Sequence, residues 1–310
     1  MNNSGAPAVA GLHKPKKNAG AIDDYIVNIV VHVVLALVAI CMLYPFLNLI
    51  AVAFSPYEEF LKNPLMVFPP KLSFDAFRYV FSSNMLWNSY YNTIFITAAG
   101  TIMSLFITIT MAYPLSKGYL KGKAAISSVM VFTMLFSGGM IPNFLLVREL
   151  GMYDTLWALI IPGLLSPYNV ILTTNFFRAM PPSLEEAAYI DGAGEGITLI
   201  KIYLPLSAPI ISTIALFVAV AYWNSYFGAV IYIKDRLRWP LQLFLREILL
   251  AANNQALATG GNIAEMDPNS VPVTSVRYAC VIVVMLPIMC FYPFLQKYFA
   301  KGVMLGAVKG

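Results

Sequence analysis

The sequence predicts an all-α, polytopic membrane protein with six transmembrane helices. Of its 310 residues, 59% are hydrophobic and only 11% are charged, and the mean hydropathy is +0.72. A soluble globular domain has about 25% charged residues. Crossing a bilayer takes roughly 20 apolar residues in a helix. Six runs meet this length, and they cover residues 26–52, 90–113, 124–147, 155–177, 203–233 and 278–296.

The first of these runs is interpreted as an uncleaved span. It follows a polar tail, residues 1–25, that contains Lys14, Lys16 and Lys17. The run is too long for the apolar core of a signal peptide, and no small-residue cleavage site follows it. The domain division is therefore an N-terminal tail over 1–25 and a membrane domain over 26–310.

The segments between the spans also carry structural signals. Phe74, Phe77 and Phe81 have helical spacing, which suits a short helix lying in the membrane interface. Residues 251–272 are polar and rich in Gly and Asn, so we expect an irregular loop there. The net charge of +5 is modest and no basic stripe is interleaved with aromatic residues, which argues against a nucleic-acid partner.

Lysine and arginine positions predict that both termini lie in the cytoplasm. With the N-terminus inside, the inner segments hold 11 basic residues in 73 positions, against 9 in 88 for the outer loops. Short loops carry the positive-inside signal most reliably. The loop 114–123, with Lys117, Lys121 and Lys123, is therefore the most informative of them.

The six runs contain no residue that could couple transport to an ion gradient. They hold no Asp, Glu, Lys or Arg, and His32 is interpreted as a tolerated interfacial residue. The chain also has no phosphate-binding G-x-x-x-x-G-K-[ST] motif. Ser137-Gly138-Gly139 lies inside the third run, where small residues favour close helix packing. We expect no cofactor in this chain, so the energy for uphill transport would come from a partner.

The predicted cytoplasmic loop 178–201 encodes a short, capped helix. Pro181 and Pro182 end the fourth span, and Ser183 with Glu186 forms a capping box. Gly192 and Gly194 are expected to end this helix after about two turns. A second short helix can then begin at Glu195, before Pro205 opens the fifth span.

This loop resembles the EAA loop of ABC-importer permeases. Glu186-Ala187-Ala188, three residues, Gly192, nine residues and Ile202-x-Leu204-Pro205 match that motif at every position. The resemblance implies an ABC-importer permease fold in which the segment 178–205 holds a coupling helix that docks into the ATPase. The residues to which it gives this role are Glu185, Glu186, Ala187, Ala188, Gly192, Ile202, Leu204 and Pro205.

Softer motifs resemble the carbohydrate permeases of the maltose-transporter group, of the LplC/YtcP oligosaccharide type. They are Asn92-Thr93-Ile94, FSGGMIP (136–142), Tyr222-Trp223-Asn224 and the tail 296–310. The resemblance implies a subunit of a sugar importer in the bacterial cytoplasmic membrane, with no enzymatic activity of its own. It also implies the partners: a second homologous permease, two cytoplasmic ABC ATPase subunits that bind ATP and Mg, and an extracytoplasmic solute-binding protein.

Aromatic and amide side chains within the runs could bind a sugar. Aromatic faces stack on pyranose rings, and amides pair with the sugar hydroxyls. Alternatively, these residues lie at the membrane–water interface or hold neighbouring helices together. For Tyr222 and Tyr226 both interpretations stay open. The candidate residues of the translocation path are Asn143, Tyr168, Asn169, Tyr222, Trp223, Asn224 and Tyr226.

Two other functions compete with sugar import. A membrane-embedded enzyme would need catalytic carboxylates or metal ligands. Glu58, Glu59 and Asp235 are the nearest candidates, but no matching His, Cys or Asp constellation accompanies them. A permease for amino acids or phosphonates would share the EAA loop, and only the softer motifs argue against it.

Overall fold

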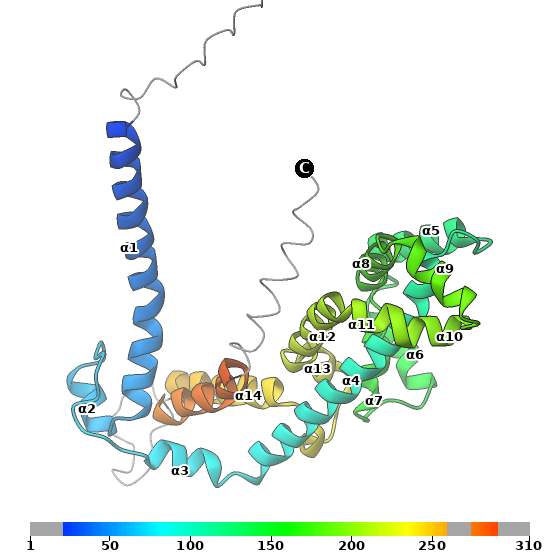
Figure 1. Ribbon diagram of the computed structural model, residues 1–310. Coiled ribbons are helices and arrows are strands. Elements are labelled where there is room, and N and C mark those ends of the chain that lie inside the picture. Colours follow the sequence, from blue (N-terminus) through cyan, green and yellow to red (C-terminus); the bar gives the residue numbers. More distant parts are fainter. Residues whose placement is uncertain (1–20, 259–273, 291–310) are drawn as a thin grey trace, which may run out of the picture.

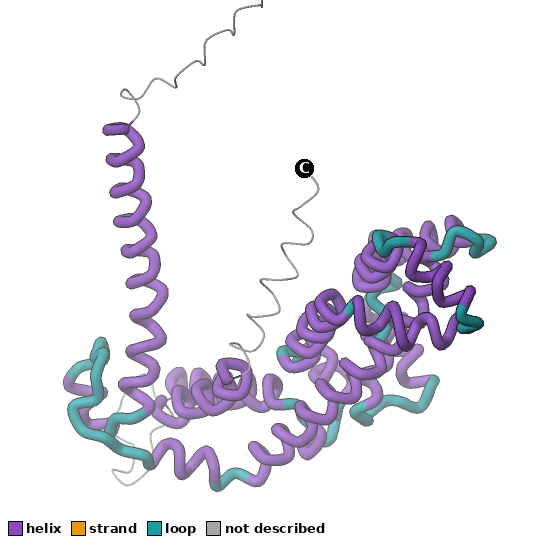
Figure 2. The backbone as a smooth tube through the Cα atoms, viewed as in Figure 1, coloured by secondary structure: helices purple, strands orange, loops and turns teal. Residues whose placement is uncertain are grey.

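The computed structural model describes residues 21–258 and 274–290, and the secondary structure of that part is entirely helical (Figure 2). The two longest helices, α1 (Ala21–Ala53) and α4 (Asn84–Ser116), have 33 residues each. The other elements are α2 (Tyr57–Lys62), α3 (Asp75–Phe81), α5 (Lys123–Leu135), α6 (Met140–Glu149), α7 (Trp157–Ile160), η1 (Ile161–Gly163), α8 (Pro167–Arg178), α9 (Pro182–Ile190), α10 (Glu195–Thr198), η2 (Leu199–Tyr203), α11 (Leu204–Leu206), α12 (Ala208–Trp223), α13 (Phe227–Tyr232), η3 (Arg236–Arg238), α14 (Leu241–Ala258) and a last apolar helix, Thr274–Cys290.

Each of the six predicted runs contains helix in its described part, but several of them are interrupted. Within the described residues, only α1 and α4 are long and apolar enough to cross a membrane as single helices. Three further runs are pairs of helices bent by 114°, 48° and 81°, so the described part has up to five spans by length and composition. The sixth run lies partly in the shorter helix Thr274–Cys290, and the rest of it lies outside the described residues.

The third run breaks where we expected helix packing. Gly138 and Gly139 are exposed between α5 and α6, and Gly139 has a φ of +88°. Glycine adopts this left-handed conformation without steric cost, whereas the right-handed helix cannot continue through it. The small residues of this triplet therefore make a sharp turn, and no described part of the chain packs against Gly138 or Gly139.

The fifth run, 203–233, is divided twice. The chain bends by 81° at Ser207, between α11 and α12, and α12 ends at Trp223 before α13 begins. Proline has no backbone N–H to donate to the carbonyl four residues earlier. Pro209, in the first turn of α12, thus leaves the carbonyl of Pro205 without its helical partner, and the helix restarts there.

Helix α4 is the central element of the fold (Figure 1). It packs against α12 and α8, and its buried residues contribute to hydrophobic clusters along its length. At its start, the Asn92 amide donates to the carbonyls of Leu237 (2.8 Å) and Trp239 (3.2 Å), and the Thr93 hydroxyl accepts from the backbone N–H of Leu241 (2.7 Å). Asn92-Thr93 is thus a structural pair that fixes the segment leading into α14.

Helices α4 and α12 approach closely at Gly100. A Cβ placed there would lie 2.6 Å from the ring of Tyr222. That ring cannot easily move, because Tyr222 is buried and its hydroxyl donates to the carbonyl of Ile160 at 3.0 Å. A small residue at Gly100 is therefore what allows the two helices to meet.

We expect Gly100→Val to lower the thermal unfolding midpoint of the detergent-solubilised protein. Overpacking a filled interface costs about 1–3 kcal/mol. Gly138→Val is the matched control, since nothing lies within 4 Å of a Cβ at Gly138 and its φ is not positive. Equal midpoints for the two variants would contradict the close approach at Gly100.

Helix α3 lies between the base of α1 and the start of α4 (Figure 1). Most of α1 stands apart from the remaining helices, and none of its most apolar window is buried against them (Figure 1). The expected short helix at 74–81 is present as α3, with Phe77 buried and Phe74 and Phe81 exposed. The expectation of an irregular loop over 251–272 was wrong for its first part, because α14 continues to Ala258; residues 259–272 lie outside the described part.

Candidate coupling site

Helix α9 forms the predicted short helix, but it begins differently from the prediction. Pro182 is its first residue and Pro181 its N-cap, with no side-chain capping bond. Proline suits the first helical position because its φ is already helical and its missing N–H would have no partner there. Ser183 consequently lies inside the first turn, and the predicted capping box between Ser183 and Glu186 does not form.

The end of α9 agrees with the prediction at Gly192. This residue has a φ of +76°, and its N–H donates to the carbonyl of Tyr189 at 3.0 Å. The next N–H, of Ala193, donates to the carbonyl of Ala188 at 2.9 Å. These two bonds are the Schellman arrangement, which satisfies the last carbonyls of a helix and usually requires glycine. Gly194 has an ordinary φ of −80° and instead precedes α10.

The residues of the predicted docking motif divide between two faces of α9. Ala188 is buried, and Glu185 is half-buried and directed towards the rest of the protein. Glu186 and Ala187 are exposed, and the residue Ile190 is 86% exposed. The two adjacent glutamates, to both of which the resemblance gives a docking role, therefore have different surroundings.

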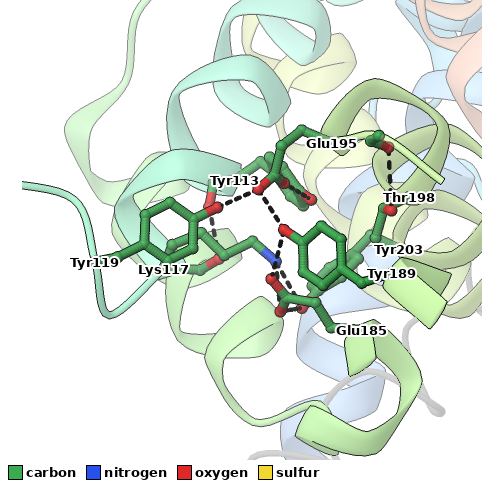
Figure 3. A network of polar contacts seen from close by, with 10 residues as sticks. Tyr113, Lys117, Tyr119, Glu185, Tyr189, Glu195, Thr198 and Tyr203 are labelled. Carbon is green, nitrogen blue, oxygen red and sulfur yellow. Dashed lines mark hydrogen bonds and ion pairs between the residues drawn. The ribbon is translucent and has the colours of Figure 1, made fainter. Parts of the chain in front are cut away.

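Lys117, just after the end of α4, holds α9 in place from the inner side (Figure 3). Its ammonium lies 2.7 Å from the Glu185 carboxylate and donates to the Tyr203 hydroxyl at 3.0 Å. The same ammonium lies 4.3 Å and 4.2 Å from the ring centroids of Tyr113 and Tyr203, within cation–π range. Only 4% of the Lys117 side chain is exposed, so a carboxylate and two aromatic faces take the place of water around this cation.

Glu195, the first residue of α10, accepts hydrogen bonds from three tyrosines (Figure 3). The Tyr113 hydroxyl donates to one carboxylate oxygen at 2.6 Å, and those of Tyr119 and Tyr189 both donate to the other. These tyrosines belong to α4, to the loop after it and to α9 respectively. Tyr113 also packs edge-on against Tyr203, and this contact connects the residues around Glu195 to those around Lys117.

Both charged groups are ionised at neutral pH. Burial lowers the pKa of Lys117, but its hydrogen bonds to Glu185 and Tyr203 outweigh this and leave the pKa above its usual value. Burial raises the pKa of Glu195, but the hydrogen bonds from its three tyrosines leave that pKa below the usual range. A lowered carboxylate pKa adds stability that is lost as the pH falls through the folded value, and a raised lysine pKa adds stability that is lost only in alkali. The network is therefore intact throughout the physiological range.

The second half of the motif continues from α10 towards the fifth run. Ile202 lies in η2, a π-helical turn, and Leu204 and Pro205 lie in α11. Ile202 and Leu204 are half-buried and Pro205 is exposed. The described helical path is thus continuous from Glu195 to Leu206 and then bends sharply into α12.

Two of the predicted path residues line a common cavity between α8 and α12. The cavity has a volume of about 300 Å³. It contains Asn169 and Tyr222 together with aromatic and hydroxyl groups that the sequence analysis had not selected. Its lining residues are Leu159, Gly163, Ser166, Asn169, Phe217, Val218, Ala221, Tyr222 and Ser225.

The other predicted path residues are not among the lining of this cavity. Asn143 and Tyr168 are exposed, and Trp223 packs partly buried against a cluster that includes Leu241. The Asn224 amide donates to the carbonyl of Val220 at 2.9 Å and accepts from Gln242 at 3.4 Å. The Tyr226 ring lies under the guanidinium of Arg246, 5.6 Å from the ring centroid.

Sequence reasoning missed the residues that hold α9. Lys117 had served only as a marker of orientation, and Tyr113, Tyr119 and Tyr203 had no assigned role. A signal was present, because Lys117 directly follows the second apolar run and the tyrosines cluster at span ends, where aromatic residues are generally enriched. That general preference concealed their specific contacts.

Fold and site together define an all-α membrane subunit of the ABC-importer permease type. The family model described as "Binding-protein-dependent transport system inner membrane component" matches residues 105–305, and the chain belongs to this family. It is therefore a transporter subunit, and the enzyme alternative is excluded.

Two curated relatives from Bacillus subtilis (strain 168) align with most of the chain. One is the "Polygalacturonan/rhamnogalacturonan transport system permease protein YtcP", 43% identical over 87% of this chain and 93% of the relative. The other is "Protein LplC", 45% identical over 86% and 89%. Among solved structures, a chain of a bacterial ABC transporter "involved in the import of the acidic polysaccharide alginate" superposes with a TM-score of 0.81 at 32% identity, covering 94% of this chain and all of that one.

Proposed function

We propose that this chain is one of two permease subunits of an ATP-driven importer that moves an oligosaccharide across the bacterial cytoplasmic membrane. The observation that carries the proposal is the EAA motif on a short helix that is tied to the end of α4 and keeps an exposed outer face. The energy would come from two cytoplasmic ATPase subunits that bind ATP and Mg. A solute-binding protein would deliver the sugar from outside.

The exposed face of α9 is the proposed docking surface for an ATPase subunit. Glu186 supplies a charge, Ala187 allows close approach, and Ile190 offers an apolar side chain that is almost fully exposed. An apolar side chain with a charged residue beside it is the combination that protein interfaces use, with an apolar centre and a polar rim. The family resemblance of the motif supports the same assignment.

The cavity between α8 and α12 is the proposed part of the translocation path within this subunit. Phe217 and Tyr222 contribute aromatic groups, whereas Ser166, Asn169 and Ser225 contribute hydroxyl and amide groups. Binding sites for small molecules typically combine an apolar lining with a few such polar groups. The second permease subunit would enclose the remaining side of this path.

An acidic oligosaccharide is the substrate class best supported. One curated relative is named for the transport of polygalacturonan and rhamnogalacturonan. The similar solved structure is of a transporter involved in the import of the acidic polysaccharide alginate. Within this chain, Arg246 stacks on Tyr226 next to the pair formed by Asn224 and Gln242. A guanidinium beside an aromatic ring and two amides is suited to a sugar that carries a carboxylate. The named relatives also favour carbohydrate over amino acids or phosphonates.

The test is reconstitution. The chain would be purified with its candidate partner permease, ATPase and binding protein, placed in liposomes, and assayed for ATP hydrolysis with neutral oligosaccharides, oligogalacturonides and alginate oligomers. We expect acidic oligomers to stimulate hydrolysis and the neutral sugars to have little effect. Stimulation by neutral sugars alone would overturn the acidic class. Failure to bind any ATPase would overturn the importer proposal itself.

A further inference from the structure

The contacts of Lys117 join parts of the chain that the backbone alone leaves loosely connected. Helix α9 is bounded by Pro181 on one side and by Gly192, in the left-handed conformation, on the other. Neither boundary continues the helix into its neighbours, so the backbone does not rigidly transmit a movement of α9. The ion pair from Lys117 to Glu185 is, by contrast, a direct side-chain link between α9 and the end of α4.

This link resists being broken. Lys117 is almost fully buried, so separating it from Glu185 would leave a cation without either a carboxylate or water. The rings of Tyr113 and Tyr203 add cation–π attraction to the same ammonium. A displacement of α9 is therefore expected to pull Lys117 with it before the pair separates.

Glu195 makes a second connection between α9 and the end of α4. Tyr113 of α4 and Tyr189 of α9 both donate to this carboxylate, so the start of α10 moves with them. Thr198, one turn further on, is fully buried and donates to the carbonyl of Gly194 at 3.2 Å. The chain from α9 to α10 is thus attached to α4 at two points.

Helix α4 extends from this attachment to the cavity. Its Ala112 and Tyr113 belong to the cluster around Lys117, and about three turns away its Gly100 lies against the ring of Tyr222, which lines the cavity. The helix has no break between these positions. Pro114 lies in the last turn of α4, but Tyr113, whose ring contacts the Lys117 ammonium, precedes it. A movement applied at Lys117 can therefore reach the cavity wall through the ring of Tyr113 and the unbroken helix between Tyr113 and Gly100.

We propose that Lys117 and Glu185 form a strut that carries the movement of α9 into α4, and through α4 to the cavity. The proposal rests on the proposed function, because it requires α9 to be the element that the ATPase moves. Lys117 is a positioning residue, since it contacts neither ATP nor the transported sugar. The tyrosines at Glu195 stabilise the strut, and Glu186 on the opposite face remains available to the partner.

The test compares Lys117→Met with Lys121→Met in the reconstituted importer. Methionine keeps the length and apolar stem of lysine but not its charge. Lys121 lies in the same loop and is exposed, so its replacement is the matched control. We expect Lys117→Met to lower the amount of sugar transported per ATP hydrolysed by about tenfold, within the usual range of coupling between sites. Lys121→Met should keep the wild-type ratio, and Lys117→Arg should restore part of it.

A purely structural role predicts a different result. If Lys117 only helps the protein to fold, Lys117→Met will lower transport and hydrolysis together and leave their ratio unchanged, which would overturn the strut. Glu185→Gln and the double variant complete a mutant cycle. The double variant should be no worse than either single variant, because both remove the same interaction. Losses that multiply would show that the two residues act separately.

The importer proposal is tested apart from the strut. It fails if the wild-type chain binds no ATPase or shows no sugar-dependent hydrolysis. The strut fails if the wild-type complex is active and the Lys117→Met complex retains the full ratio of transport to hydrolysis.

Discussion

The Gly192→Pro variant is expected to reach the membrane but to lose sugar-dependent transport. Gly192 has a φ of +76°. Proline is confined to about −65° and has no N–H. The substitution therefore removes the bond to the Tyr189 carbonyl and changes the direction of the chain between α9 and α10. Transport and ATP hydrolysis in liposomes would be measured together with the amount of inserted protein.

Two further glycine variants make this prediction specific. Gly192→Ala keeps the N–H but strains the left-handed residue, which costs about 1 kcal/mol, so a partial loss is expected. Gly194→Ala is the matched control, because Gly194 has an ordinary φ and nothing lies within 4 Å of a Cβ there. Full transport by Gly192→Pro would mean that coupling does not depend on how α9 ends.

The Glu186→Lys variant is expected to abolish sugar-stimulated ATP hydrolysis without lowering the stability of the subunit. Glu186 is exposed on α9, and its replacement disturbs no packing within the described part of the chain. Reversing its charge places a cation where the proposed ATPase surface receives an anion, and like-charge contacts across an interface are strongly unfavourable. Co-purification of the ATPase and stimulated hydrolysis would both be measured.

The control for this variant is Glu149→Lys, the same charge reversal at an exposed residue on the predicted outer side. It should leave ATPase binding unchanged. Glu185→Gln provides the contrast within α9, since it should weaken the inner attachment to Lys117 while the ATPase still binds. Normal stimulation by Glu186→Lys would place the docking contact elsewhere on the loop.

The cavity suggests why a permease can have an uncharged interior. No Asp, Glu, Lys or Arg lies in the predicted spans, and the cavity wall combines aliphatic and aromatic side chains with hydroxyl and amide groups. Such groups can exchange hydrogen bonds with a sugar without holding it tightly. Arg246, which lies over the ring of Tyr226, is the cation to which we assign the proposed recognition of a carboxylate.

Local patterns were enough to predict several features at the coupling site. The prolines at 181 and 182, together with Gly192, delimit a helix because their backbone preferences act within a few residues. The start of that helix was still misplaced by two residues, because the N-cap is Pro181 and not Ser183. Pro182 fits the first helical position, and this excluded the capping bond that Ser183 would otherwise make.

Hydropathy was a poorer guide to the shape of the spans. It averages composition over a window and does not detect a break within an apolar run. Gly139 has a positive φ, and Pro209 lacks the backbone N–H that would continue the helix. Each residue lies where one predicted span is divided into two helices. The same averaging could not assign Tyr222, whose hydroxyl is satisfied by a carbonyl 62 residues away while its ring meets both Gly100 and the cavity.

By itself, the sequence determined that the chain is a membrane protein, the class of its fold and the position of the short helix that we propose as the coupling helix. Composition, apolar run length and a fixed motif spacing are local properties, and they suffice for these features. Only the tertiary structure decided which of two adjacent glutamates turns inward, and that a lysine from another loop meets it. Lys117 and Tyr203 are 86 residues apart, and their contact exists because α4 and η2 pack together. Contacts over such separations depend on how helices are arranged in space, and no short pattern in the chain specifies that arrangement.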